Sequence, residues 1–279
     1  MGPLLLDAYA GRVVPEGVGR TALGVARVRA YESRRPDRLF EDPYAEAFVA
    51  AAPDAFPEER NTSAQVSAIG VMFAAQGIVR TRFYDDYLLG AGCRQVVLLA
   101  AGLDTRAYRL GWPAGTRLFE LDLRDVLEFK ERVLAERRAR PRCERTVVPV
   151  DLREDWATPL VAAGLDRDVP TAWLAEGLLI YLSREEASRL LTDVGRLSAP
   201  YSHISCEYGD PPDLPPIPAL ERYQALWKGG LGASAPDWLA GHGWRVEVHD
   251  RAALAVDYGR PELAAPDGAG GFVTAVRAG

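Results

Sequence analysis

Acidic residues follow short apolar runs of this sequence at points where strands of a parallel sheet would end. The apolar run 96–99 leads into the turn Ala100-Ala101-Gly102, and a second run, 118–119, leads into Glu120-Leu121-Asp122. A buried strand, a tight turn of small residues and an acid roughly twenty residues beyond it are typical of the nucleotide-binding half of a Rossmann-type sheet. The turn lets the backbone approach a ligand closely, and the carboxylate of Asp122 can accept hydrogen bonds from both ribose hydroxyls. This spacing predicts an adenosine ligand: NAD, FAD or S-adenosylmethionine.

The composition of the turn favours one of these ligands. Gly102 is the single glycine of a loop that would need the pattern G-x-G-x-x-G to hold a dinucleotide, and Arg106 stands roughly where that pattern needs a small residue. The carboxylate of Asp104 would repel a pyrophosphate, and it suits a ligand that carries a cationic amino group. The loop therefore favours S-adenosylmethionine over a dinucleotide.

Two further strand ends carry acids. Val147 to Val150 runs directly into Asp151-Leu152, and Thr171 to Ala175 runs into Glu176. Asp151 can accept a hydrogen bond from an adenine amino group while the next backbone N–H meets a ring nitrogen; the alternative role is an N-cap for a helix over 153–163. Glu176 is either a ligand contact or a similar capping group.

The elements that must position these residues alternate in type, which is typical of a mostly parallel sheet with helices on both faces. Seven strands are predicted near 96–100, 117–121, 146–150, 171–175, 202–207, 244–249 and 272–277. Helices are predicted near 62–90, 124–139, 153–163, 184–197, 219–228 and 236–241.

Three regions between these elements add detail. Residues 19–56 have a helical pattern that Pro36 and Pro43 divide into short pieces. The segment between the last two strands has no strong helical pattern, so the chain is predicted to end in an antiparallel hairpin. The proline-rich stretch 210–218 follows the fifth strand, where it is either a loop that closes over substrate or a rigid connector.

Length and composition limit the possible domain organisation and partners. The 279 residues predict one domain, 1–279, in which a helical cap (1–60) covers a Rossmann-like core (61–279) with a lid segment near 210–235. A net charge of −6 argues against a nucleic-acid partner, and the Arg-rich run 132–142 alternates with acids, as a solvated helix end does.

Cysteine and histidine usage argues against a metal centre and against disulfides. The three cysteines lie far apart with no C-x-x-C pair, and the three histidines have no ligand spacing. The N-terminus has Leu4-Leu5-Leu6 without a basic region or a long apolar core, so no signal peptide is expected, and no run is long enough to cross a membrane. A cytoplasmic, reduced protein without a metal is therefore expected, and its oligomeric state stays open.

At this point the sequence resembles the leucine carboxyl methyltransferase family of S-adenosylmethionine-dependent methyltransferases, and is most similar to an actinobacterial branch that includes polyketide carboxyl O-methyltransferases. The resemblance extends over nearly the whole chain. The blocks that carry it are Thr21-Ala22-Leu23, residues 29–36, residues 40–45, residues 80–86, Ala101-Gly102-Leu103-Asp104-Thr105-Arg106, Glu120-Leu121-Asp122, residues 175–182, Trp238-Leu239, Gly243-Trp244 and Tyr258-Gly259-Arg260.

The resemblance implies a fold and a set of roles. The fold is the Rossmann-like class I methyltransferase fold, an α/β architecture with a seven-stranded, mostly parallel sheet, an antiparallel last strand and an N-terminal helical cap. Asp122 would hold the ribose, Asp151 and Leu152 would flank the adenine, and Glu176 would face the methionine portion of the donor. Arg80 is the preferred partner of the donor carboxylate, with Arg82 as the alternative.

One position departs from the family pattern. The family has Gly-Ala-Gly where this chain has Ala100-Ala101-Gly102, so an extra methyl group stands where the backbone meets the ligand. We expect this methyl group to reduce the affinity for the cofactor without abolishing it.

The acceptor follows from chemistry. Methyl transfer from a sulfonium requires alignment and desolvation, and an ionised carboxylate needs no general base, whereas a phenol benefits from one. The sequence places no histidine convincingly at the carboxyl end of a strand, so a small-molecule carboxylate in secondary metabolism is the leading acceptor, with Tyr181 and Tyr208 as candidates for its pocket. The alternative acceptors are a phenol, a hydroxyl group or a protein C-terminal carboxylate. The alternatives from other classes of protein are an NAD(P)-binding oxidoreductase and a binding protein without catalytic activity.

Overall fold

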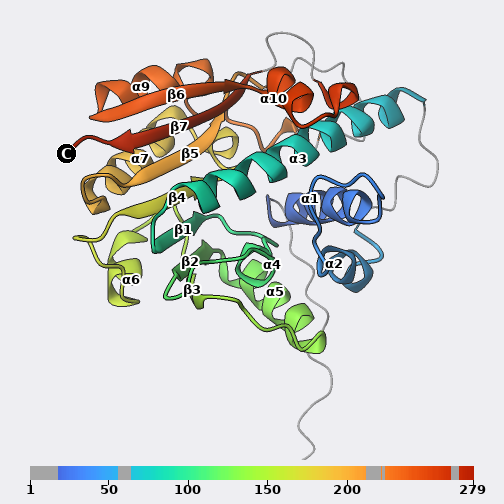
Figure 1. Cartoon of the computed structure of the whole chain (residues 1–279), viewed down its shortest axis with the longest axis horizontal. Coiled ribbons are helices and arrows are strands. Elements are labelled where there is room, and N and C mark those ends of the chain that lie inside the picture. The colour runs from blue at the N-terminus through green and yellow to red at the C-terminus, as the bar shows by residue number, and fades with distance from the viewer. Residues whose placement is uncertain (1–17, 56–63, 212–220, 222–223, 265–269) are drawn as a thin grey trace, which may run out of the picture.

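The protein is built on one seven-stranded sheet with strand order β3-β2-β1-β4-β5-β7-β6 (Figure 1). The computed structural model describes residues 18–55, 64–211, 221, 224–264 and 270–279. Four strand pairs are parallel, and β7 is antiparallel to both of its neighbours, β5 and β6. The strands are β1 (Gln95–Leu99), β2 (Arg117–Asp122), β3 (Glu144–Pro149), β4 (Thr171–Ala175), β5 (His203–Tyr208), β6 (Trp244–Asp250) and β7 (Gly271–Arg277). This confirms the predicted mostly parallel sheet with an antiparallel ending.

The central strands are buried on both faces because successive side chains point to opposite sides of a strand. In β1, Val96 and Leu98 join the core on the side of the long helix α3 (Ala64–Gly90), while Val97 and Leu99 join the core on the other side. The first core also contains residues of α1 (Val18–Ser33), α2 (Ala45–Ala51), α5 (Arg124–Glu136) and α10 (Arg251–Asp257). The second core is closed by α6 (Ala157–Ala162), α7 (Arg184–Leu197) and α9 (Ala235–Gly241).

The long helix α3 ends at Gly90, as predicted from the glycines of that region. It packs aromatic side chains against the end of the sheet: the Phe83 ring stacks on Phe272 at 4.5 Å between centroids, and Tyr84 meets the same ring edge-on at 5.3 Å. The predicted start of this helix, at residues 62–63, lies outside the described residues.

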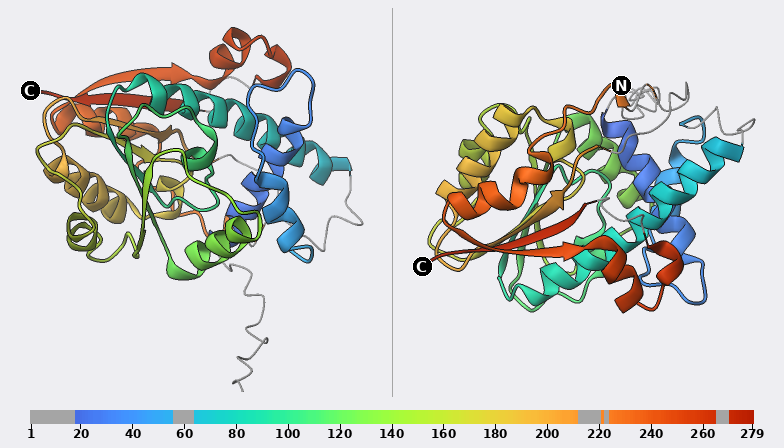
Figure 2. Two further views of the ribbon diagram at one scale, coloured as in Figure 1. Left: turned by 60° about the horizontal axis from the view of Figure 1, so that its bottom comes forward. Right: turned by 90° about the horizontal axis from the view of Figure 1, so that it is seen from above.

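The N-terminal helix α1 lies beside α3, and α2 packs against α1 and α5 on the side away from α3 (Figures 1 and 2). The first ends at Ser33, before Pro36, and the second begins after Pro43, which confirms that these prolines divide the region. Asp42 stabilises the turn that leads into the second helix, since its Oδ1 accepts hydrogen bonds from the backbone N–H groups of Tyr44 and Ala45. The predicted boundary of the cap at residue 60 falls within 56–63, outside the described residues.

Several sequence predictions need correction. The helix predicted over 153–163 spans only Ala157–Ala162, with the preceding residues in turns. The connection between the last two strands, predicted to lack a helix, contains α10 and a 3-10 turn, Pro261–Leu263. A short helix, α4 (Arg106–Arg109), was not predicted.

The helix predicted over 219–228 is wrong at its C-terminal end: residues 221 and 224 are helical, whereas 225–228 form a turn and irregular chain. Residues 219, 220, 222 and 223 and the proline-rich stretch 212–218 lie outside the described residues. In the described part of the lid segment, the backbone N–H groups of Lys228 and Gly229 donate to the carbonyl of Ile180 at 2.8 and 3.1 Å. None of the described helices is both long enough and apolar enough to span a membrane.

Candidate functional site

The predicted site residues gather at the edge of the sheet where its parallel strands end. Register explains why: Leu99 pairs with Leu121, so the turn after β1 and Asp122 at the end of β2 lie side by side. The backbone N–H of Val150 donates to the carbonyl of Asp122, which brings the end of β3 to the same edge. Ligands bind at this edge in open α/β sheets.

Within the described residues, the hydrogen-bond donors to the Asp122 carboxylate are all backbone N–H groups. Its Oδ2 accepts from the Gly102 N–H at 2.6 Å, and its Oδ1 accepts from the Leu123 N–H at 2.7 Å. Burial raises the pKa of this carboxyl, and these two hydrogen bonds oppose that rise. Each oxygen keeps a lone pair, so the carboxylate can still accept hydrogen bonds from a vicinal diol.

The turn between β1 and Asp122 is tightly constrained. Both Ala100 (φ 53°) and Gly102 (φ 49°) adopt the left-handed conformation. A Cβ at Gly102 would lie 3.3 Å from the Cβ of Ala22 in α1, so glycine leaves room for the N-terminal helix. Ala100 has no such freedom, and the left-handed conformation costs an L-residue roughly 1–2 kcal/mol. The departure from the family glycine therefore introduces backbone strain in addition to a methyl group.

Asp151 lies at the end of β3, and its carboxylate pairs with Arg153 through Nε at 2.9 Å and Nη2 at 2.5 Å. This pairing lowers the pKa of Asp151. The structure rejects the capping alternative, because α6 begins only at Ala157 and the carboxylate near its start that accepts from Thr158 N–H is that of Asp155. Leu152, the next residue of the predicted adenine site, is half-buried against the core of the α7 face.

Glu176, at the end of β4, lies between two guanidinium groups. Its Oε2 is 2.7 Å from Nη1 of Arg106, and its Oε1 is 3.0 Å from Nε of Arg80. Burial alone would raise the pKa of Glu176, but the two cations outweigh it and lower the pKa below its ordinary 4.5. The site thus holds a fixed negative charge at this strand end.

Arg106 is the centre of this charge network, which the sequence did not reveal. Its side chain is almost fully buried, and Nε lies 2.7 Å from Oδ1 of Asp85 in α3, which also pairs with Arg109 at 2.6 Å. Nη1 pairs with Asp104 as well as Glu176. Although burial opposes ionisation, Arg106 and its neighbours bring the pKa of Asp104 to about 2. Asp104, expected to face a cationic ligand group, is therefore paired with a cation of the protein.

The two candidate arginines of α3 point in different directions. Arg80 faces the strand ends and is one-fifth exposed, with Glu176 and Glu207 as its ion-pair partners. Arg82 lies over the outer surface, where it pairs with Asp86 at 2.8 Å and its guanidinium carbon is 5.4 Å from the Tyr258 ring centroid. Geometry therefore brings Arg80, and not Arg82, to the candidate site.

Glu207, near the end of β5, is a site residue that the sequence analysis missed. Its Oε1 is 3.2 Å from Nη1 of Arg80, and both carboxylate oxygens accept from the Gly177 N–H at 2.9 Å. The signal that could have identified it is the same as for Glu176, an acid at the carboxyl end of a buried strand.

The far side of the site lies where β5 and β6 end and β7 begins. Tyr181, in a 3-10 turn (Leu179–Tyr181), and Tyr208, the last residue of β5, are both half-buried. Arg251 begins α10 directly after β6, and its guanidinium carbon lies 5.2 Å from the centroid of the Phe272 ring. Phe272 is the register partner of Glu207, so a buried cation stands beside this end of the site.

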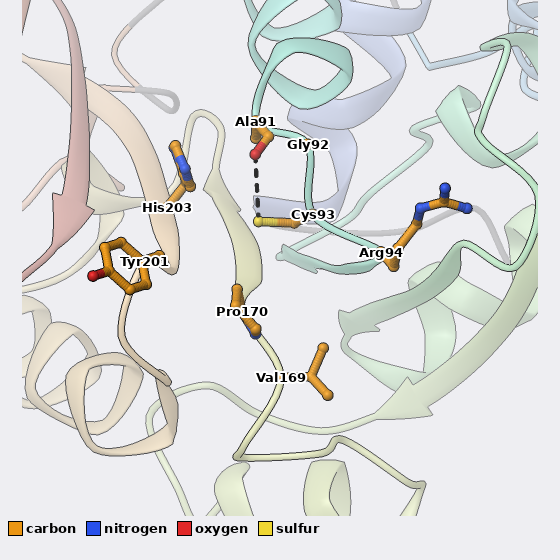
Figure 3. Close-up of a pocket in the computed structure, with 8 residues that line it drawn as sticks. All are labelled: Ala91, Gly92, Cys93, Arg94, Val169, Pro170, Tyr201 and His203. Atoms are coloured by element: carbon orange, nitrogen blue, oxygen red, sulfur yellow. Dashed lines mark hydrogen bonds between the residues drawn. The ribbon is translucent and has the colours of Figure 1, made fainter. Parts of the chain in front are cut away.

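A separate cavity of about 350 Å³ lies at the opposite edge of the sheet (Figure 3). Its lining comes from residues just before β1 and β4 and from the beginning of β5, including Cys93, Pro170 and His203. Burial raises the pKa of the Cys93 thiol to about 11, which leaves it unreactive at neutral pH. Because its lining lies at the amino ends of β1, β4 and β5, this cavity is distinct from the site at the carboxyl edge. No cluster of potential metal ligands occurs within the described ranges.

The sequence of this chain is similar to those of known proteins. The family model described as leucine carboxyl methyltransferase matches residues 22–195, more than half of the 279 residues. A protein of Parafrankia sp. (strain EAN1pec), provisionally named an S-adenosyl-L-methionine-dependent methyltransferase, is 54% identical over 94% of this chain and 88% of its own. A protein with the same description from Streptomyces coelicolor is 45% identical over 95% of this chain and 97% of its own.

A solved structure agrees at the level of the fold. The crystal structure of a protein of Thermobifida fusca YX, provisionally described as a methyltransferase, superposes with a TM-score of 0.55 at 18% identity, covering 91% of this chain and 94% of that one. This likeness confirms the class I methyltransferase fold, and the relatives confirm S-adenosylmethionine as the cofactor. The chain belongs to the leucine carboxyl methyltransferase family and is an S-adenosylmethionine-dependent methyltransferase.

Proposed function

We propose that this methyltransferase transfers the methyl group to a carboxylate oxygen of a small molecule, in cytoplasmic secondary metabolism. The observation that carries the proposal is the buried guanidinium of Arg251 beside the far end of the site, stacked on Phe272. Arg251 adds positive charge to this end of the site, which also contains the Glu207 carboxylate, and this positive charge favours an anionic over a neutral acceptor.

The donor roles follow from the contacts at the strand ends. Asp122 accepts hydrogen bonds from the ribose hydroxyls, while Asp151 and Leu152 meet the adenine. The backbone at Ala100 and Gly102 approaches the donor closely. Glu176 faces the ammonium group of the donor, and Arg80 pairs with its carboxylate. The spare lone pairs of Asp122 and the preformed charges of Glu176 and Arg80 fit such a ligand.

The reaction itself makes few demands on the protein. Bound S-adenosylmethionine supplies an electrophilic methyl group that a nucleophilic oxygen attacks in line. The chain orients the acceptor and excludes water, with Tyr181 and Tyr208 lining the acceptor pocket. An ionised carboxylate needs no general base. His203 lines the opposite cavity and His242 stacks on Trp238. His249, contrary to the sequence expectation, lies at the carboxyl end of β6 beside Phe272, with its Nε2 2.8 Å from Oγ1 of Thr274.

The test is the chemical stability of the product. The enzyme is incubated with methyl-tritiated donor and a panel of carboxylic acids, their primary amides and phenols, and each labelled product is then treated with mild base. We expect label only in the acids, released by base as volatile methanol, because esters hydrolyse and aryl methyl ethers do not. Base-stable label in the phenols would refute the proposal in favour of hydroxyl methylation, and Asp122→Ala serves as the donor-binding control.

Calorimetry separates the remaining alternatives. S-adenosylhomocysteine should bind while NAD does not, which would count against an oxidoreductase. Binding without any turnover on the panel or on a cell extract would favour a silent binding protein.

A further inference from the structure

We propose that Glu207 is a positioning residue that holds the Arg80 guanidinium in place for the carboxylate of the methyl donor. The inference deepens the proposed donor site and rests on the role proposed there for Arg80. Glu207 does not itself contact the donor in this proposal.

Contacts on two sides fix the Glu207 carboxylate. Both of its oxygens accept from the Gly177 N–H at 2.9 Å, in the turn where Gly177 adopts φ 59° directly after Glu176. Its Oε1 also lies 3.2 Å from Nη1 of Arg80. A Cβ at Gly177 would lie 3.4 Å from the same Arg80 nitrogen, so the turn itself packs against the guanidinium. Glu207 therefore joins the end of β5, the turn after β4 and helix α3 at one point.

The need for this carboxylate arises from competition for Glu176. Before the donor binds, Arg80 contacts Glu176 through Nε at 3.0 Å and Glu207 through Nη1 at 3.2 Å. To bind, the zwitterionic end of the donor must replace the Arg80–Glu176 ion pair. Its ammonium group then pairs with Glu176, and its carboxylate pairs with Arg80. During this exchange Glu207 keeps an anionic partner beside Arg80.

Without Glu207, Arg80 and Glu176 would form a tighter ion pair with each other. Of the two carboxylates, only Glu176 would remain to pair with Arg80. This ion pair would then compete with the donor's carboxylate for Arg80 and with its ammonium group for Glu176. The adenosine end would be unaffected, because Asp122 is held by Gly102 and Leu123 on the other side of the turn. Loss of Glu207 should therefore weaken recognition of one end of the donor alone.

The experiment compares two ligands by calorimetry. S-adenosylhomocysteine carries the amino-acid end, whereas 5′-methylthioadenosine lacks it and contains the same adenosine. Both are titrated into the full-length wild type and the variants Glu207→Gln, Glu207→Asp, Arg80→Gln and the double variant Arg80→Gln/Glu207→Gln. Glu247→Gln is the matched control, because this glutamate is exposed on the edge strand β6.

We expect Glu207→Gln to weaken S-adenosylhomocysteine roughly tenfold, about 1.4 kcal/mol, while methylthioadenosine changes less than about twofold. The shorter Glu207→Asp should give a smaller loss of the same kind, and Glu247→Gln no loss. In the Arg80→Gln background, Glu207→Gln should add nothing, because the residue acts through Arg80.

Three results would overturn the proposal: equal losses for both ligands, no loss for either, or an additive loss in the double variant. Failure of the underlying donor site has a different signature. If Arg80→Gln itself leaves the preference for S-adenosylhomocysteine unchanged, the role proposed for Arg80 is wrong, whatever Glu207 does.

Discussion

Two carboxylates at the same edge of the sheet are stabilised in opposite ways. Asp122 is held by backbone N–H groups, and burial raises its pKa, whereas Glu176 lies between Arg106 and Arg80, and its pKa is lowered. The first suits neutral hydroxyl groups, which need an acceptor with spare lone pairs. The second suits an ammonium group, which needs a charge that stays ionised.

The two arrangements also contribute differently to stability. Because the folded pKa of Asp122 is raised above 3.8, the folded state holds this proton more tightly than the unfolded state, and stability falls as the pH rises through that window. Glu176 has a lowered pKa, so its contribution is present above 4.5 and is lost as the pH falls through its folded pKa. Asp122, in the proposed adenosine half of the site, therefore costs stability at neutral pH, whereas Glu176, in the proposed methionine half with Arg80 and Arg106, adds to it.

The largest expected effect comes from breaking the charge network of the methionine half. Arg106→Met leaves Asp104, Glu176 and Asp85 without their shared buried cation, which should lower the free energy of unfolding by about 3–5 kcal/mol in urea denaturation. Arg124→Met removes an arginine that is mostly exposed and should cost less than about 0.5 kcal/mol. A loss below about 1 kcal/mol at Arg106 would mean that the network contributes no net stability.

The adenosine half should respond to Asp122→Ala in binding. Loss of a charge-assisted acceptor should cost about 1.5–3 kcal/mol for both S-adenosylhomocysteine and methylthioadenosine, measured by calorimetry. This pattern differs from that of Glu207→Gln, which spares methylthioadenosine. Asp125→Ala, at an exposed acid in the first turn of α5, is the matched control. Unchanged affinity in Asp122→Ala would contradict the ribose role proposed for Asp122.

Acid should weaken the two halves at different pH values. As the pH falls through the raised pKa of Asp122, its carboxylate takes up a proton, and the affinity for methylthioadenosine should fall, by up to about tenfold per pH unit below that pKa. Above pH 4.5 Glu176 stays ionised because its own pKa is lowered. In Asp122→Asn the affinity should be independent of pH over this range. A slope that persists in this variant would assign the titration to another group.

The smallest effect is expected at the turn that serves both halves. Ala100→Gly removes the left-handed strain of Ala100 but adds freedom to the unfolded chain, so the net gain in the free energy of unfolding should be at most about 1 kcal/mol. Ala101→Gly, at a buried neighbour without a positive φ, should destabilise by about 0.5–1 kcal/mol. Equal effects of the two substitutions in unfolding experiments would rule out strain at Ala100.

The adenosine half was predictable because its determinants are local. Buried strands, the turn around Gly102 and the acids Asp122 and Asp151 follow one another at fixed spacing, and parallel strands bring their carboxyl ends to one edge whatever surrounds them. The same rule placed Glu176 and would have placed Glu207. The helix within 250–257 was missed because its seven residues are too few for a periodic pattern to stand out.

The sequence by itself determined the class of fold, the cofactor and the acids at the strand ends, since these follow from patterns along the chain. Only the tertiary structure decided which charges face one another. Residues of α3, the turn after β1 and the ends of β4 and β5 meet across long separations, so the sequence could neither choose Arg80 over Arg82 nor identify Arg106 as the buried partner of Glu176. A charge acquires its pKa and its role from neighbours that the fold supplies.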